Sequence, residues 1–133
     1  MENNNAELEA LRSEAINYCN QGNFDKAITI HRDILTRYKG NGEACAYSYA
    51  SIGDIYLTLR ELELAEDYLK KALNYEPLNP NYHYLLGFTY FVLEQWDGAI
   101  TEFEVSVKQQ PYVQPTAFPL DGGAPRLDTE GEA

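Results

Sequence analysis

The sequence has few cysteines and no long apolar run. Its two cysteines, Cys19 and Cys45, fit a reduced cytosolic context, and we expect both to be small packing residues. No apolar run reaches the roughly 18 residues that a membrane-spanning helix needs. The stretch from Met1 to Ala10 is polar and acidic, unlike a signal peptide. These features predict a cytoplasmic protein that does not enter a membrane.

Positive charge is also scarce. The chain has 10 lysines and arginines against 21 aspartates and glutamates, which gives a formal net charge of −11. Nucleic acids and anionic membrane surfaces are bound through basic patches. We therefore expect no nucleic acid and no membrane as a partner, and a basic or apolar peptide is the better candidate.

The sequence lacks the short motifs that carry chemistry. It has no glycine-rich phosphate loop, no His-x-x-x-His, no Cys-x-x-Cys and no Gly-x-Ser-x-Gly. Carboxylates are numerous, but none has a histidine partner or a second converging acid. The two histidines, His31 and His83, lie at positions where packing or capping explains them. We predict that the protein is not an enzyme and has no catalytic residue, no metal site and no cofactor.

What the sequence does contain is an internal repeat. Apolar residues make up 44% of the chain and are spaced periodically. A step of 34 positions joins seven matching pairs, which is a strong repeat signal. The pairs are Tyr49–His83, Ile52–Leu86, Gly53–Gly87, Tyr56–Tyr90, Ala65–Ala99, Leu69–Phe103 and Pro77–Pro111.

The repeated pattern resembles the tetratricopeptide repeat (TPR), a helix-turn-helix unit. That unit carries an aromatic residue, Leu-Gly, Tyr, Ala, Phe and Pro in this order, and only the first place differs here, where His83 replaces the usual tryptophan. The resemblance implies an all-α, right-handed superhelix of three hairpins within residues 1–111. The repeats cover about residues 8–41, 46–79 and 80–113. Ala65 and Ala99 should lie at tight contacts between the two helices of their hairpins.

The first copy is weaker than the other two, as expected for a terminal repeat. Asn4 or Asn5 is expected to cap its first helix. The step from Ala27 to Ala65 is 38 positions, so four residues are inserted. A loop at 39–42, which contains two glycines, accounts for them.

The third copy should begin at Asn79-Pro80, because proline fits the first turn of a helix. Its first helix is apolar nearly all round. One face packs within the array, and a second face has no partner in the three repeats. This second face comprises Tyr84, Phe88, Phe91 and Val92. It would be explained by a capping helix outside the repeats, a ligand, the chain's own tail or self-association.

Residues 112–133 change composition abruptly and form a tail rich in proline and glycine. The spacing of the prolines excludes a fourth hairpin and favours an irregular, extended segment. The tail follows the third hairpin directly, so it is tethered close to the uncovered face. We expect Phe118 or Leu120 to pack on that face, in the same or a neighbouring chain.

In the TPR family the first helix of each hairpin lines a concave groove that binds extended peptides or partner helices. The resemblance therefore implies a protein or peptide partner. One subgroup clamps the carboxylate end of cytosolic chaperones with basic and amide side chains. At the positions of this chain that correspond to those clamp residues, only Arg12 is positively charged. We therefore expect the carboxylate clamp to be missing. The implied groove residues are Arg12, Ile16, Tyr47, Asp54, Tyr84, Leu85, Phe88, Phe91 and Val92.

The predicted function is that of a protein-interaction module, such as an adaptor, an assembly factor or a co-chaperone. Two alternatives stay open at this point. One is a small acidic chaperone of the secretion type, a class that also uses three such repeats. The other is the targeting module of a longer enzyme.

Overall fold

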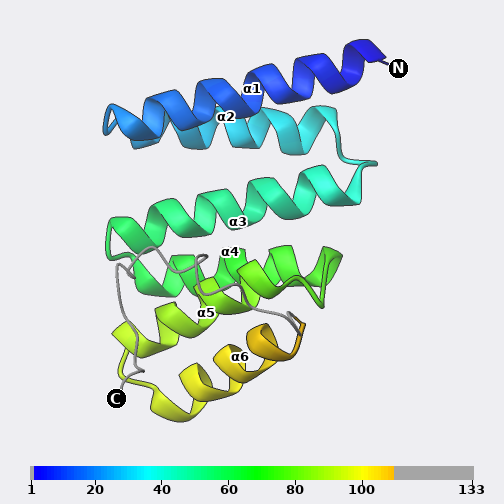
Figure 1. The fold of residues 1–133 in the computed structure, drawn as a ribbon. Coiled ribbons are helices and arrows are strands. Elements are labelled where there is room, and N and C mark those ends of the chain that lie inside the picture. Colours follow the sequence, from blue (N-terminus) through cyan, green and yellow to red (C-terminus); the bar gives the residue numbers. More distant parts are fainter. Residues whose placement is uncertain (1, 110–133) are drawn as a thin grey trace, which may run out of the picture.

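The computed structural model describes residues 2–109, which form six helices arranged as three antiparallel hairpins (Figure 1). No strand occurs among these residues. The hairpins stack one after another as the all-α, right-handed superhelix that the repeat predicts. The helices are α1 (Glu2–Asn20), α2 (Phe24–Arg37), α3 (Gly42–Thr58), α4 (Leu62–Tyr75), α5 (Pro80–Val92) and α6 (Trp96–Gln109).

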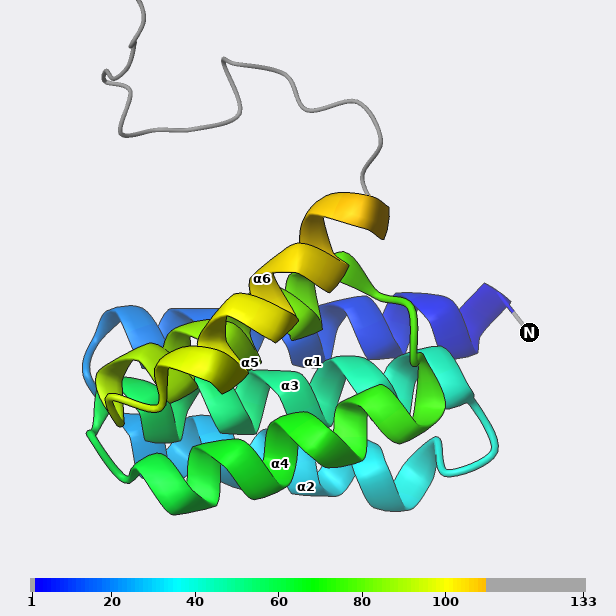
Figure 2. The ribbon, with the colours of Figure 1, turned by 90° about the horizontal axis from the view of Figure 1, so that it is seen from below.

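The first five helices form two layers, and α6 lies across α5 at the end of the stack (Figure 2). Seen along the stack, α1, α3 and α5 overlie one another, and α2 and α4 overlie one another beside them (Figure 2). Each helix packs against the next one in the chain, and α3 also contacts α5 directly. One layer of the stack is therefore built from the first helix of each hairpin.

The two helices of the second hairpin, and those of the third, approach closely at a glycine. A methyl group added to Gly53 would lie 2.9 Å from Cγ of Leu69, and one added to Gly87 would lie 2.8 Å from two ring carbons of Phe103. Ala65 is fully buried and Ala99 is 3% exposed. The near-complete burial predicted for these two alanines is therefore confirmed.

The three hairpin turns share one backbone geometry. The second residue after each first helix has a positive φ, which is 77° at Gly22, 64° at Arg60 and 62° at Glu94. The next residue donates a backbone hydrogen bond of 2.8 Å to a carbonyl five positions earlier, the pattern of a Schellman cap. These bonds are Asn23 to Tyr18, Glu61 to Tyr56 and Gln95 to Tyr90.

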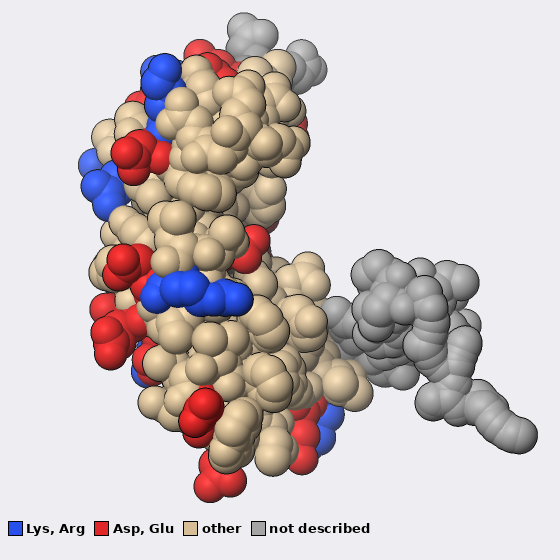
Figure 3. All heavy atoms as spheres, turned by 90° about the vertical axis from the view of Figure 1, so that its left-hand side faces the viewer, with Lys and Arg blue, Asp and Glu red and all other residues tan. Residues whose placement is uncertain are grey.

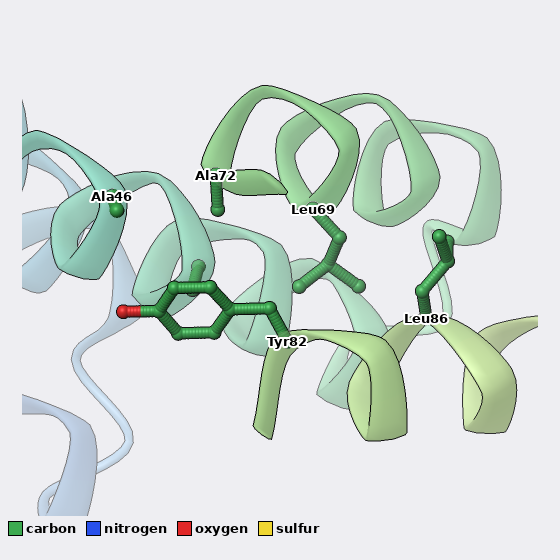
Figure 4. Close-up of a cluster of buried hydrophobic side chains, with 6 residues drawn as sticks. Ala46, Leu69, Ala72, Tyr82 and Leu86 are labelled. Carbon is green, nitrogen blue, oxygen red and sulfur yellow. The ribbon is translucent and has the colours of Figure 1, made fainter. Parts of the chain in front are cut away.

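Between the second and third hairpins, Tyr82 projects from α5 toward α3 (Figure 4). Its ring belongs to a buried cluster with small residues of α3 and two leucines. Burial, followed by the nearby charge of Glu76, raises the pKa of Tyr82 to about 12. The phenol therefore stays neutral while it fills this interface. The cluster comprises Ala46, Ala50, Leu69, Ala72, Tyr82 and Leu86.

The helix starts correct two expectations and confirm one. α1 begins at Glu2, so the prediction that Asn4 or Asn5 caps it is wrong. The helix extends through both asparagines because residues 2–6 contain no proline or glycine that would interrupt it. Gly42 is the first residue of α3 rather than part of the loop, because the Asn41 side chain caps the helix by accepting a bond from Ala44 N–H. α5 begins at Pro80 as predicted, with Asn79 as its cap. The tail 112–133, with the expected docking of Phe118 or Leu120, lies outside the described residues.

His31 occupies the place in the first hairpin that Leu69 and Phe103 take in the other two. It is 4% exposed, and its Nδ1 lies 3.1 Å from Oγ of Ser48. Burial, with a smaller effect of the positive Arg12, lowers the pKa of His31 to about 4. His31 is therefore a neutral packing residue near pH 7.

His83 bridges helices rather than filling the core. Its Nδ1 lies 2.7 Å from Oε1 of Glu102 on α6, and its Nε2 lies 2.7 Å from the carbonyl oxygen of Pro77. The ring thus ties α5 to α6 and to the turn that precedes α5. The contact with Glu102 shows that the expectation of no histidine partner for any carboxylate is wrong. This polar contact stands where the repeat pattern usually has a tryptophan.

The left-handed turns generate the first prediction. A side chain at positive φ is strained by roughly 1 kcal/mol, and glycine is not. We expect Glu94→Gly to raise the free energy of unfolding by about 0.5–1 kcal/mol and Gly22→Ala to lower it by a similar amount. Urea denaturation of both variants measures this. Destabilisation by Glu94→Gly would show that the side chain of Glu94 is needed in the turn.

The buried histidine generates the second prediction. As the pH falls below about 6.5, the unfolded chain protonates His31 while the folded chain does not, so stability falls until about pH 4. The loss amounts to roughly 3 kcal/mol at most. His31→Leu should remove this part of the pH dependence while the carboxylates, common to both proteins, keep theirs. Urea denaturation between pH 4 and 7 tests this, and parallel curves for the two proteins would contradict it.

Candidate peptide-binding groove

Two adjoining hollows lie along the layer of α1, α3 and α5. The first, of about 200 Å³, is lined by α1, α3 and the buried His31 of α2, and the second, of about 260 Å³, by α3, the turn after it and α5. Asp54 lines both. The first is lined by Ala15, Ile16, Cys19, His31, Tyr47, Ser51, Asp54 and Ile55, and the second by Asp54, Leu57, Thr58, Arg60, Tyr84, Leu85 and Phe88.

One face of α3 forms the floor that joins the hollows. Tyr47, Ser51, Asp54 and Thr58 follow one another at steps of three or four, so they lie on the same side of this helix. The opposite side of α3 is buried against its neighbours. The central position of α3 in the stack therefore places Asp54 between the first and third hairpins.

Charge in the hollows is sparse, with one acid, Asp54, and one base, Arg60, among the described lining residues. Asp54 is an exposed residue, and partial desolvation by its neighbours raises the pKa of its carboxyl. Burial and then the charge of Asp54 raise the pKa of the Cys19 thiol, so this thiol stays protonated near pH 7. The one cation among the described lining residues is Arg60, whose guanidinium donates to the carbonyl of Leu57 at 3.0 Å.

Arg12 is held by the protein itself. Its guanidinium forms ion pairs with Glu9 at 3.3 Å and Glu43 at 2.9 Å, and lies 4.4 Å from the ring centre of Tyr47. The side chain is only 12% exposed. Its charge is therefore balanced by two carboxylates. Arg12 is the one clamp position at which this chain has a cation.

The structure brings six of the nine expected groove residues to the hollows. Arg12, Phe91 and Val92 do not line them. Phe91 is 50% exposed, stacks on Phe88 with 6.3 Å between ring centres, and meets Trp96 edge-on at 5.4 Å. The six are Ile16, Tyr47, Asp54, Tyr84, Leu85 and Phe88.

The uncovered apolar face extends beyond α5. Tyr84 is 55% exposed and contacts the ring of Phe103 on α6, whereas Phe88 and Val92 are half-buried. On α6, Trp96, Ile100 and Val107 are also exposed. Their spacing of four and seven residues is a helical stripe that the sequence alone could have revealed.

Two lining residues come from places that the groove pattern does not cover. Arg60 belongs to the turn after α3, and His31 reaches the first hollow from α2. A pattern based on the first helix of each hairpin does not include these two residues, because they reach the hollows only through the way the hairpins stack. On the face seen in Figure 3, charged side chains gather mainly along one margin of the stack.

Two further properties bear on the class of protein. No helix within residues 2–109 is long and apolar enough to cross a membrane. The same residues contain no group of three or more histidine, cysteine, aspartate or glutamate side chains arranged to hold a metal ion.

The stacked hairpins and the open inner layer define a helical-repeat protein of the superhelical class. Two tetratricopeptide repeat family profiles match the sequence, one at residues 7–75 and one at residues 50–113. The chain belongs to the tetratricopeptide repeat family. No curated protein sequence matches it.

Solved TPR structures share the fold. The first TPR of Spaghetti (RPAP3), bound to the HSP90 peptide SRMEEVD, matches with a TM-score of 0.70 at 17% identity, over 86% of this chain and 88% of that one. The crystal structure of MamA matches with a TM-score of 0.66 at 22% identity, over 78% and 58%. A MamA structure from Desulfovibrio magneticus RS-1 matches with a TM-score of 0.62 at 25% identity, over 78% and 56%. The chain thus spans little more than half the length of these MamA chains.

Arg12 generates the third prediction. Arg12→Ala removes a cation from the Tyr47 ring and an ion pair that joins α1 to α3, so the free energy of unfolding should fall by about 1–2 kcal/mol. Glu9→Ala removes only the exposed partner on α1 and should change it by less than about 0.5 kcal/mol. Urea denaturation of both variants measures the difference. An unchanged stability of Arg12→Ala would mean that its charge is free for a ligand.

Proposed function

We propose that this TPR domain is a protein-interaction module, without catalytic activity, that holds an extended segment of a partner protein along α1, α3 and α5. The observation that carries the proposal is the pair of adjoining hollows that meet at Asp54. Their walls are mostly apolar or aromatic, as in surfaces that bury side chains of a partner. The nine residues expected from the sequence remain our proposal for the binding surface.

The size of the hollows supports a peptide rather than a cofactor. Each is smaller than the roughly 300–1,000 Å³ that is usual for small-molecule sites. Two hollows in a row suit successive side chains of one extended chain. The RPAP3 repeat, which has the same fold, was solved with a peptide of HSP90, which supports peptide binding by this architecture.

The finer role that we propose is an adaptor, assembly factor or co-chaperone in the cytoplasm. The proposed binding domain covers residues 1–111, with residues 112–133 as a separate tail. In this role the partner's identity is set by the side chains of the groove, since the helical scaffold is common to the family.

The fourth prediction tests the location of the binding surface. A photoreactive amino acid at Thr58, which lines the second hollow, should crosslink a partner protein in an extract of the native cells. The same amino acid at Asn74, an exposed position of α4, is the matched control and should not. Mass spectrometry of the crosslinked bands identifies the partner. Equal crosslinking from both positions, or crosslinking from Asn74 alone, would contradict the proposal.

A further inference from the structure

We propose that the groove selects a partner segment in which a lysine or arginine lies between apolar or aromatic residues, with its cation at Asp54 and its neighbours in the two hollows. This inference rests on the proposed function of the groove and specifies the chemistry of its partner.

The central point is that Asp54 is a carboxylate without a counter-charge. It is the one described residue that lines both hollows. Within residues 2–109 its side chain makes no ion pair or hydrogen bond; only its backbone carbonyl is used, by Thr58 Oγ1 at 3.0 Å. Arg60 lines the second hollow alone and donates to Leu57. The Asp54 carboxylate is therefore exposed, unpaired within the described residues and accessible to a cation of a partner at the point where the hollows meet.

The environment of Asp54 agrees with this reading. Asp54 is exposed where the two hollows meet; partial desolvation raises the pKa of its carboxyl, and no nearby cation among residues 2–109 lowers that pKa again. Its negative charge also raises the pKa of Cys19 across the first hollow. An arriving guanidinium or ammonium group would balance the charge, and a hydrogen bond to a charged group contributes roughly 1.5–3 kcal/mol.

The walls on either side of Asp54 specify the flanking residues. Ile16, Tyr47 and Ile55 border the first hollow, and Tyr84 and Phe88 border the second. Apolar side chains of a partner would be buried against these walls. Arginine has a further advantage over lysine, because its planar guanidinium also stacks on aromatic rings.

An acidic ligand is less suited to the same groove, because its one described lining cation, Arg60, shares the second hollow with the Asp54 carboxylate. Arg12 already balances Glu9 and Glu43, so its cation is not available to a peptide carboxylate. A carboxylate placed near Asp54 would be repelled. The groove is therefore expected to disfavour peptides such as SRMEEVD, which the RPAP3 repeat holds.

The chain itself contains one segment of the proposed chemistry. Among residues 110–133 the single basic residue is Arg126, which lies between Pro125 and Leu127. A tethered segment competes at high effective concentration with a free peptide. Occupation by this segment is therefore an outcome that the test must separate from binding of a partner.

The test uses full-length protein and fluorescent peptides with blocked ends. The peptides carry arginine, glutamine or glutamate between two leucine-proline pairs, and SRMEEVD is the acidic comparison. Fluorescence anisotropy should show that the arginine peptide binds at least about tenfold tighter than the glutamine peptide, and that SRMEEVD binds weakest. Asp54→Asn should abolish this preference, and Asp54→Lys should reverse it toward the glutamate peptide. Asp67→Lys, an equal charge change at an exposed position of α4, is the control and should leave the preference intact.

Arg126→Gln, in the full chain, identifies the competing occupant. If the arginine peptide binds only in this variant, the chain's own segment fills the groove and the partner-directed inference is overturned. Equal binding of the arginine and glutamine peptides, an unchanged preference in Asp54→Lys, or no peptide binding in either protein also overturns it. The proposed function is judged separately, since crosslinking from Thr58 reports any partner whatever its charge.

Discussion

The close approach of two helices at a single glycine is the constraint on which the rest of this structure depends. Gly53 and Gly87 leave just enough room for Leu69 and Phe103 of the facing helix. A side chain at either glycine would push the helices apart and change the tilt of each hairpin against the next. Because the groove is formed by helices of three successive hairpins, its shape is set by these contacts, which lie outside the groove.

The fold was predictable because the repeat encodes contacts at a fixed sequence distance. The step of 34 relates Gly53 to Gly87 and Leu69 to Phe103, and the equivalent contacts, Gly53 with Leu69 and Gly87 with Phe103, form in both hairpins. Local details were less predictable. Glu94 adopts a left-handed conformation that sequence rules reserve for glycine, because the Schellman bonds of the turn outweigh its strain.

The candidate groove was predictable to a lesser extent. Helix periodicity places Tyr47 and Asp54 on one side of α3, and the structure shows them at the hollows. Periodicity does not show which residues form ion pairs between different helices. Arg12 is balanced by Glu43, which is 31 positions away in another hairpin. Such long-range pairs depend on the stacking of hairpins, so the availability of a cation in the groove follows only from the three-dimensional arrangement.

The middle hairpin touches both of its neighbours, and this has a consequence for stability. In a linear array the total stability is approximately the sum of the hairpins and of the interfaces between adjacent ones. A segment that lies across α1, α3 and α5 contacts all three hairpins at once, so its binding free energy adds to both interfaces. Binding of the segment and packing of the hairpins against one another are then thermodynamically linked. The end hairpins unfold locally less often when the groove is occupied.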